Sequence, residues 1–163
     1  IDKGGDILAP GEPTDTVQFT DVKDLAGFVV SSTDKELVGA YNVFKTLTMK
    51  EMFDAIISIK NKESNPNLIW VPASFIFQNR LSSAGEVPMW VSHTELEKGF
   101  FQISNAKAIK AGLQMRPASE TFKETKQAFY KHHNDFNFLD ERTGVKLARM
   151  EKELLDKWLA QKK

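Results

Sequence analysis

The 163-residue chain contains no cysteine. Disulfide bonds, thiolate metal sites and a cysteine nucleophile are therefore excluded, and the composition is compatible with a cytoplasmic location. No apolar run approaches the roughly 18–20 residues of a membrane-spanning helix, and residues 1–5 do not resemble a signal peptide. We therefore expect a cytoplasmic protein without a membrane partner.

The chain also lacks an excess of charge of either sign. Lys and Arg total 22, and Asp and Glu total 22. No run of basic residues is longer than the terminal pair Lys162-Lys163. A neutral balance gives no electrostatic reason to expect nucleic acid or an anionic membrane surface.

The motifs of common nucleotide-dependent enzymes are absent too. The sequence has no Gly-x-Gly-x-x-Gly, no Gly-x-x-x-x-Gly-Lys-Ser/Thr and no Gly-x-Ser-x-Gly. The only tyrosines are Tyr41 and Tyr130. Lys45 follows Tyr41 by four positions, but such a pair shares one face only on a helix, and a strand is expected here. No catalytic residue is assigned.

Three histidines are the remaining candidates for metal or acid–base chemistry: His93, His132 and His133. His132 and His133 are neighbours near a helix end, point in different directions and have no evident third ligand. We predict no metal site. His93 lies in a loop rich in polar and aromatic residues, where it is a candidate to line a pocket.

The apolar pattern predicts α/β, or α+β for an isolated piece, as one domain covering residues 1–163. Short strands are expected at residues 7–8, 17–19, 39–45, 68–71 and 100–103. About five to six helices are expected, at 22–32, after a capping box at Thr48, at 75–77, at 105–111, from 117 and from 145. In the first helix, Val22, Leu25, Ala26 and Val29 recur at helical spacing and should face a core. The 39–45 strand is typical of one inside a larger sheet.

Several short motifs follow one another in the order of a known family. Residues 17–26 read Val-Gln-Phe-Thr-Asp-Val-Lys-Asp-Leu-Ala, residues 39–44 contain Gly-x-Tyr-Asn, and residues 104–117 read Ser-Asn-Ala-Lys-Ala … Ala-Gly-Leu … Arg-Pro. This set resembles the second half of extended short-chain dehydrogenases/reductases, the NAD-dependent epimerase/dehydratases. The resemblance runs from about Pro10 to Tyr130.

The resemblance implies a Rossmann-type enzyme whose N-terminal half binds NAD or NADP and carries a Tyr-x-x-x-Lys pair. Because neither feature is found, this chain is expected to be the substrate-binding C-terminal part, with residues 39–45 adding a strand to the other half's sheet. The implied substrate contacts are Val17, Gln18, Met89, Trp90 and His93. Structural roles fall to Asp21, Asp24, Asn42 and Arg116.

Departures from the family pattern narrow the implied substrate. Nucleotide-sugar members carry diphosphate-clamping arginines where this sequence has Val17 and Glu97 or Lys98. Valine cannot replace a bidentate guanidinium, and lysine offers only a point charge. We therefore expect a small molecule other than a nucleotide sugar.

A free-standing interaction module without catalysis is the alternative, and a homo-oligomer is compatible with either hypothesis. The two differ in a structural consequence. A detached half should expose an apolar face and leave residues 41–44 without strand partners, whereas a self-sufficient module should cover both.

Overall fold

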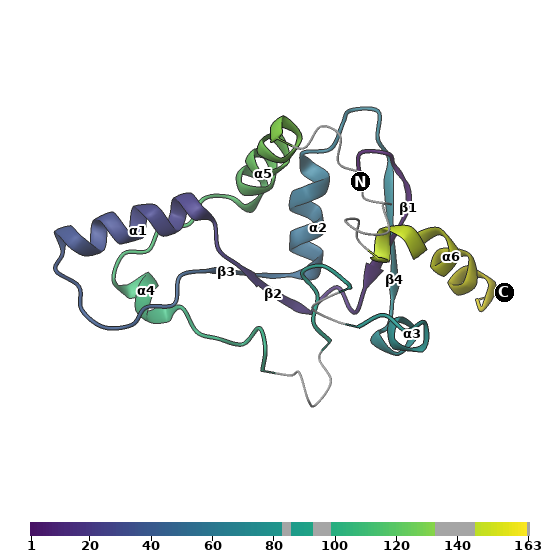
Figure 1. Cartoon of the computed structure of the whole chain (residues 1–163), viewed down its shortest axis with the longest axis horizontal. Coiled ribbons are helices and arrows are strands. Elements are labelled where there is room, and N and C mark those ends of the chain that lie inside the picture. Colours follow the sequence, from purple (N-terminus) through teal and green to yellow (C-terminus); the bar gives the residue numbers. More distant parts are fainter. Residues whose placement is uncertain (83–85, 93–98, 133–145, 163) are drawn as a thin grey trace.

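The computed structural model describes residues 1–82, 86–92, 99–132 and 146–162, which contain six helices and four short strands (Figure 1). The elements follow in the order β1 (Gly5–Pro10), β2 (Thr16–Phe19), α1 (Val22–Asp34), β3 (Lys45–Thr48), α2 (Met49–Ser58), β4 (Pro66–Val71), α3 (Ala73–Gln78), α4 (Ala106–Lys110), α5 (Ala118–His132) and α6 (Lys146–Ala160). The expectation of a mixed α/β chain is confirmed.

The four strands form two separate pairs. β1 and β4 are parallel, in a register that runs from Gly5 opposite Pro66 to Pro10 opposite Val71. β2 and β3 are antiparallel, with Thr16 opposite Thr48 and Phe19 opposite Lys45. Parallel pairs are usually found inside larger, covered sheets, and here α6 contributes to the cover. Its Glu151 carboxylate accepts a hydrogen bond from the Leu8 N–H at 3.0 Å.

The main core forms around β1 and β4, which lie between α2 and α6 in Figure 1. We call this cluster of buried side chains the main core; its members come from the strands, α2, α3, the 81–90 segment and α6. They are Leu8, Val17, Met49, Met52, Val71, Phe75, Ile76, Leu81, Val87, Trp90, Leu154 and Leu155. The amphipathic helix predicted after residue 145 is confirmed as α6, and its apolar stripe docks on this core.

A second, smaller cluster lies in what we call the distal lobe, residues 20–44 and 104–115. Figure 1 shows α1 and α4 at the far end of the molecule from α6, reached through β2 and β3. Its buried side chains are Phe28, Ala108 and Leu113, with Tyr41 and Val43 among those packed around them. None of the described main-core residues belongs to this lobe.

Helices α1, α3 and α4 end in the same way. A residue with positive φ follows each C-cap: Glu36 (φ 51°), Arg80 (φ 59°) and Gly112 (φ 102°). The next residue is always leucine, and its N–H bonds to the carbonyl five positions earlier, as in Leu37 to Ser32. This is the Schellman arrangement. Gly112 was predicted to end its helix, and it does.

Three sequence-based expectations are wrong in detail. Residues 39–44 form no strand, and pairing begins only at Lys45, which is antiparallel to β2. Residues 100–103 hold a turn instead of a strand. The third error concerns the face of α1, because Val22, Leu25, Ala26 and Val29 all point away from the core.

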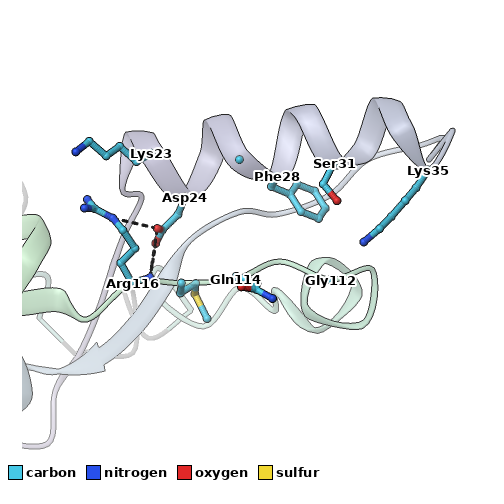
Figure 2. A pocket seen from close by; sticks show the side chains of 10 residues that line it. Lys23, Asp24, Phe28, Ser31, Lys35, Gly112, Gln114 and Arg116 are labelled. Atoms are coloured by element: carbon cyan, nitrogen blue, oxygen red, sulfur yellow. Dashed lines mark hydrogen bonds and ion pairs between the residues drawn. The ribbon is translucent and has the colours of Figure 1, made fainter.

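The rotation of α1 follows from contacts with a segment about ninety residues later in the chain. Asp24 and Phe28, one turn apart, point inward toward the 112–116 segment (Figure 2). An ion pair fixes Asp24 and apolar packing fixes Phe28, so the residues at positions 22, 25, 26 and 29 must take the opposite side.

Candidate functional site

The four predicted substrate contacts that the structure describes, Val17, Gln18, Met89 and Trp90, do not gather around one open cavity. Val17, on β2, is fully buried in the main core. Gln18 follows it on the other face of the strand, and its side-chain amide donates to Thr46 Oγ1 at 3.1 Å and to the Ile103 carbonyl at 2.8 Å. Gln18 thereby fastens the chain that enters α4 to the β2–β3 pair.

Met89 and Trp90 have different surroundings although they are adjacent. Trp90 is 1% exposed and belongs to the main core, where its indole N–H donates to Asp15 Oδ2 at 3.0 Å. Met89 is 39% exposed and has a left-handed backbone with φ 58°. His93 lies outside the described residues. Substrate contact by Gln18, Met89 and His93 stays a prediction, whereas Val17 and Trp90 are core side chains in this structure.

Five polar side chains at the starts of α1 and α5 form a connected group that we call the Arg116 cluster: Asp21, Asp24, Arg116, Thr121 and Glu124. The Arg116 guanidinium pairs closely with Asp21 and contacts Glu124 at 3.1 Å. Its Nε lies 3.5 Å from Asp24, whose carboxylate also accepts from the Arg116 backbone N–H at 3.3 Å. The cluster joins the start of α1 to the start of α5.

Asp21 is the most constrained member of this cluster. One carboxylate oxygen caps α1 by accepting from the N–H groups of Lys23 and Asp24, and the other accepts from Arg116 and from the Thr121 hydroxyl. Burial opposes ionisation, but these hydrogen bonds outweigh it and lower the pKa of Asp21 from 3.8 to about 2. The hydrogen bond to Asp21 in turn raises the pKa of Arg116.

The assignment of Asp21, Asp24, Asn42 and Arg116 to structure agrees with these contacts; Asn42 donates to the Ser104 carbonyl at 3.0 Å. The sequence interpretation missed Thr121 and Glu124. An available signal was their spacing, because Thr121 and Glu124 lie three positions apart on a helix that starts just after Arg116-Pro117 and therefore share one helical face.

A cleft of about 550 Å³ runs between α1 and the 112–116 segment (Figure 2). Three of its lining residues are cationic, but each already has a partner: Lys23 pairs with Glu124 at 2.8 Å, Lys35 donates to the Ala111 carbonyl at 3.0 Å, and Arg116 is held by carboxylates. Among the residues described, this cleft therefore offers no uncommitted cation for a phosphate.

The outward side of α1 is apolar and open. We call Val22, Leu25, Ala26, Val29 and Val30 the α1 outer face; Val22 is 75% exposed and Val30 63%. Beside it runs a groove of about 510 Å³, bounded by this helix and by residues 36–43. Contiguous apolar surface of this kind is typical of a site that another protein layer covers.

The backbone next to that groove is also incompletely bonded. Within the described part of the chain, no backbone N–H of residues 38–44 donates a hydrogen bond. Several carbonyls of the segment are instead satisfied by side chains: Lys107 donates to Ala40 O, Thr20 to Val43 O and Asn105 to Phe44 O. These side chains hold the segment in place without using its donors.

The chain matches no family model, no curated protein and no solved structure. Among the described helices, none is long and apolar enough to cross a membrane. No group of three or more His, Asp or Glu side chains that could hold a metal ion occurs in the described residues.

Proposed function

We propose that this chain is the substrate-binding portion of an NAD(P)-dependent epimerase/dehydratase or reductase. It binds a small substrate other than a nucleotide sugar and is not catalytic alone. NAD or NADP is held by an N-terminal dinucleotide-binding half, which also supplies the proton-transferring residues. The ordered motifs between residues 17 and 117 support this assignment.

The observation that carries the proposal is that the distal lobe exposes apolar side chains and backbone N–H groups without an acceptor. The α1 outer face and the free N–H groups of residues 38–44 are the two features that separate a detached half from a self-sufficient module. An apolar helix face needs a layer to cover it, and backbone N–H groups without an acceptor can bond to a strand of a partner. A sheet-containing dinucleotide-binding half supplies both.

The Arg116 cluster gives further support. Asp21 and Asp24 belong to the motif at residues 17–26, and Arg116 belongs to the motif at residues 104–117, more than ninety positions later. Hydrogen bonds join them directly. The resemblance rested on separate short motifs, and in space their polar residues form one cluster. Their role is to orient α1 and thus the face offered to the other half.

Cofactor binding tests the proposal most directly. We expect the 163-residue chain to show no NAD or NADP binding by calorimetry. Joined to the polypeptide encoded immediately before it in the gene, it should bind one of them. Tight binding of either dinucleotide by the chain alone would contradict the proposal, as would a preceding sequence without a glycine-rich βαβ unit.

A pair of variants tests whether the α1 outer face contacts the dinucleotide-binding half. Val29→Glu places a charge on the α1 outer face, where the native side chain is 55% exposed, so the isolated chain should still fold. Cofactor binding by the joined protein should fall at least tenfold. Ala160→Glu, at an exposed position at the end of α6, introduces the same charge and should change nothing. Equal effects of the two variants would favour the non-enzymatic interaction module.

Substrate class has its own test. The joined protein should show no calorimetric signal with a uridine-diphosphate sugar, because Val17 is a buried core residue and offers no charge to the diphosphate. Micromolar binding would refute this part of the proposal and leave the cofactor assignment intact.

A further inference from the structure

The distal lobe has far less internal packing than the rest of the molecule. Among the residues that the structure describes, its cluster contains three buried side chains, Phe28, Ala108 and Leu113, whereas twelve form the main core. It is joined to the main core at its base, through β2 and β3 and through the Arg116 cluster (Figure 1). Regions with few buried apolar contacts and exposed backbone hydrogen bonds open at a lower free energy than a core does.

The sequence of α1 adds to this imbalance. The helix contains Gly27 and the uninterrupted run Val29-Val30-Ser31-Ser32-Thr33, all residues that disfavour a helix relative to alanine. Such a helix depends on tertiary packing, yet only Asp24 and Phe28 are buried on it. By contrast, α2 has a complete capping box and α6 is rich in Leu, Glu and Lys.

We infer that the distal lobe opens independently of the main core, so that α1 and α4 unfold and refold while β1, β4, α2 and α6 stay intact. The lobe becomes stable when a partner layer covers the α1 outer face. This last step rests on the proposed function, but independent opening is a property of the chain alone.

The two ends of the distal lobe are held differently, as independent opening requires. The contacts at its base are polar and specific, because Asp21 fixes the first turn of α1 and Arg116 fixes Asp24. The far end, from Ser31 to Gly39, is exposed or half-buried throughout. The helix therefore keeps an anchored start from which it re-forms, and its distal turns depend on what covers them.

Hydrogen exchange measured residue by residue on the whole chain tests this inference. In the native protein the amides of α1 and α4 should exchange at least a hundredfold faster, after correction for intrinsic rates, than those of α2 and β4. A lobe whose amides are protected as strongly as the main core would overturn the inference.

Two matched variants make the test sharper. Gly27→Ala adds a Cβ that meets nothing within 4 Å, and should slow exchange in α1 by about fivefold, the usual Gly-to-Ala gain inside a helix. Exchange in α2 and β4 should not change. Thr48→Ala removes the α2 cap and should speed exchange in α2 and β4 while leaving α1 as it was.

If each variant changes the exchange rates of the lobe and of the main core by the same factor, the chain unfolds as one unit and the inference fails. That result would leave the cofactor experiments untouched. Conversely, an isolated chain that binds NAD would contradict the proposed function without affecting the exchange pattern, so the two failures are distinguishable.

Discussion

The indole N–H of Trp90 donates a hydrogen bond to Asp15 Oδ2 at 3.0 Å, across a sequence separation of 75 residues. The bond joins the loop after β1 to the 86–92 segment and satisfies the polar atom of a side chain that is otherwise enclosed in the main core. Gly11 lies against it with φ 75°. A Cβ at that position would overlap both Trp90 Nε1 and Asp15 Oδ2.

Gly11→Ala should therefore destabilise the main core. The substitution strains a left-handed backbone and displaces a buried hydrogen-bonded pair, so we expect a loss of about 2–3 kcal/mol. Urea denaturation followed by tryptophan fluorescence measures it. Gly99→Ala is the control, because its Cβ would meet nothing within 4 Å. Similar midpoints for the two variants would show that the Gly11 contact is not restrictive.

The low pKa of Asp21 makes the distal lobe sensitive to acid. Because the pKa is about 2 in the folded state against 3.8 in the reference state, the ionised carboxylate stabilises the fold above about pH 4. This contribution, on the order of 2 kcal/mol, is lost as the pH falls toward 2. Carboxyl-carbon NMR titration should give the low pKa directly, together with loss of α1 signals over the same pH range.

Asp21→Asn should remove that acid dependence and weaken α1 already at neutral pH. Asp54→Asn is the matched control, since its pair with Lys50 is exposed and such pairs contribute little. An acid transition of α1 that is unchanged in Asp21→Asn would mean that other carboxylates of the cluster, not Asp21, control it.

The capping box at Thr48 was predicted from sequence, and the structure contains it in full. The Thr48 hydroxyl accepts from the Glu51 N–H at 3.1 Å, and the Glu51 carboxylate accepts from the Thr48 N–H at 2.7 Å. Thr48→Ala should cost about 1 kcal/mol. Thermal unfolding measures this, and Thr48→Ser, which keeps the hydroxyl, should retain most of the stability. Equal losses in both would assign the effect to packing of the methyl group.

Local signals were enough to predict most elements, because a cap such as Asp21, a stop such as Gly112 and a stripe such as that of α6 act within a few residues. The inward face of α1 was not predictable in this way. Val22, Leu25 and Val29 form the better apolar stripe, yet an ion pair with Arg116, more than ninety residues away, turns Asp24 inward. Periodicity identifies an apolar face but does not say whether this chain or another covers it.

In the candidate site, too, tertiary contacts decide what local sequence signals cannot. Trp90 and Val17 were predicted as substrate contacts because the family resemblance implied it, and tertiary packing buries both. Residues 39–44 have the apolar alternation of a strand, and Tyr41 and Val43 do pack inward on Phe28. Hydrogen-bonded strand structure requires a neighbour, however, and side chains such as Asn105 and Lys107 occupy several of the segment's carbonyls instead.

The end of α1 gives a last prediction. Glu36 takes the left-handed position of the Schellman arrangement, φ 51°, where α4 uses Gly112. A side chain is unfavourable there, so Glu36→Gly should stabilise the distal lobe by about 0.5–1 kcal/mol, net of the extra freedom glycine gains on unfolding. Asp34→Gly, two residues earlier and inside the helix, should destabilise it by a similar amount. Exchange of the α1 amides reports both changes. If both glycines weaken α1, the left-handed position carries no strain, and the helix end is held mainly by Leu37, whose N–H bonds back to Ser32 at 2.9 Å.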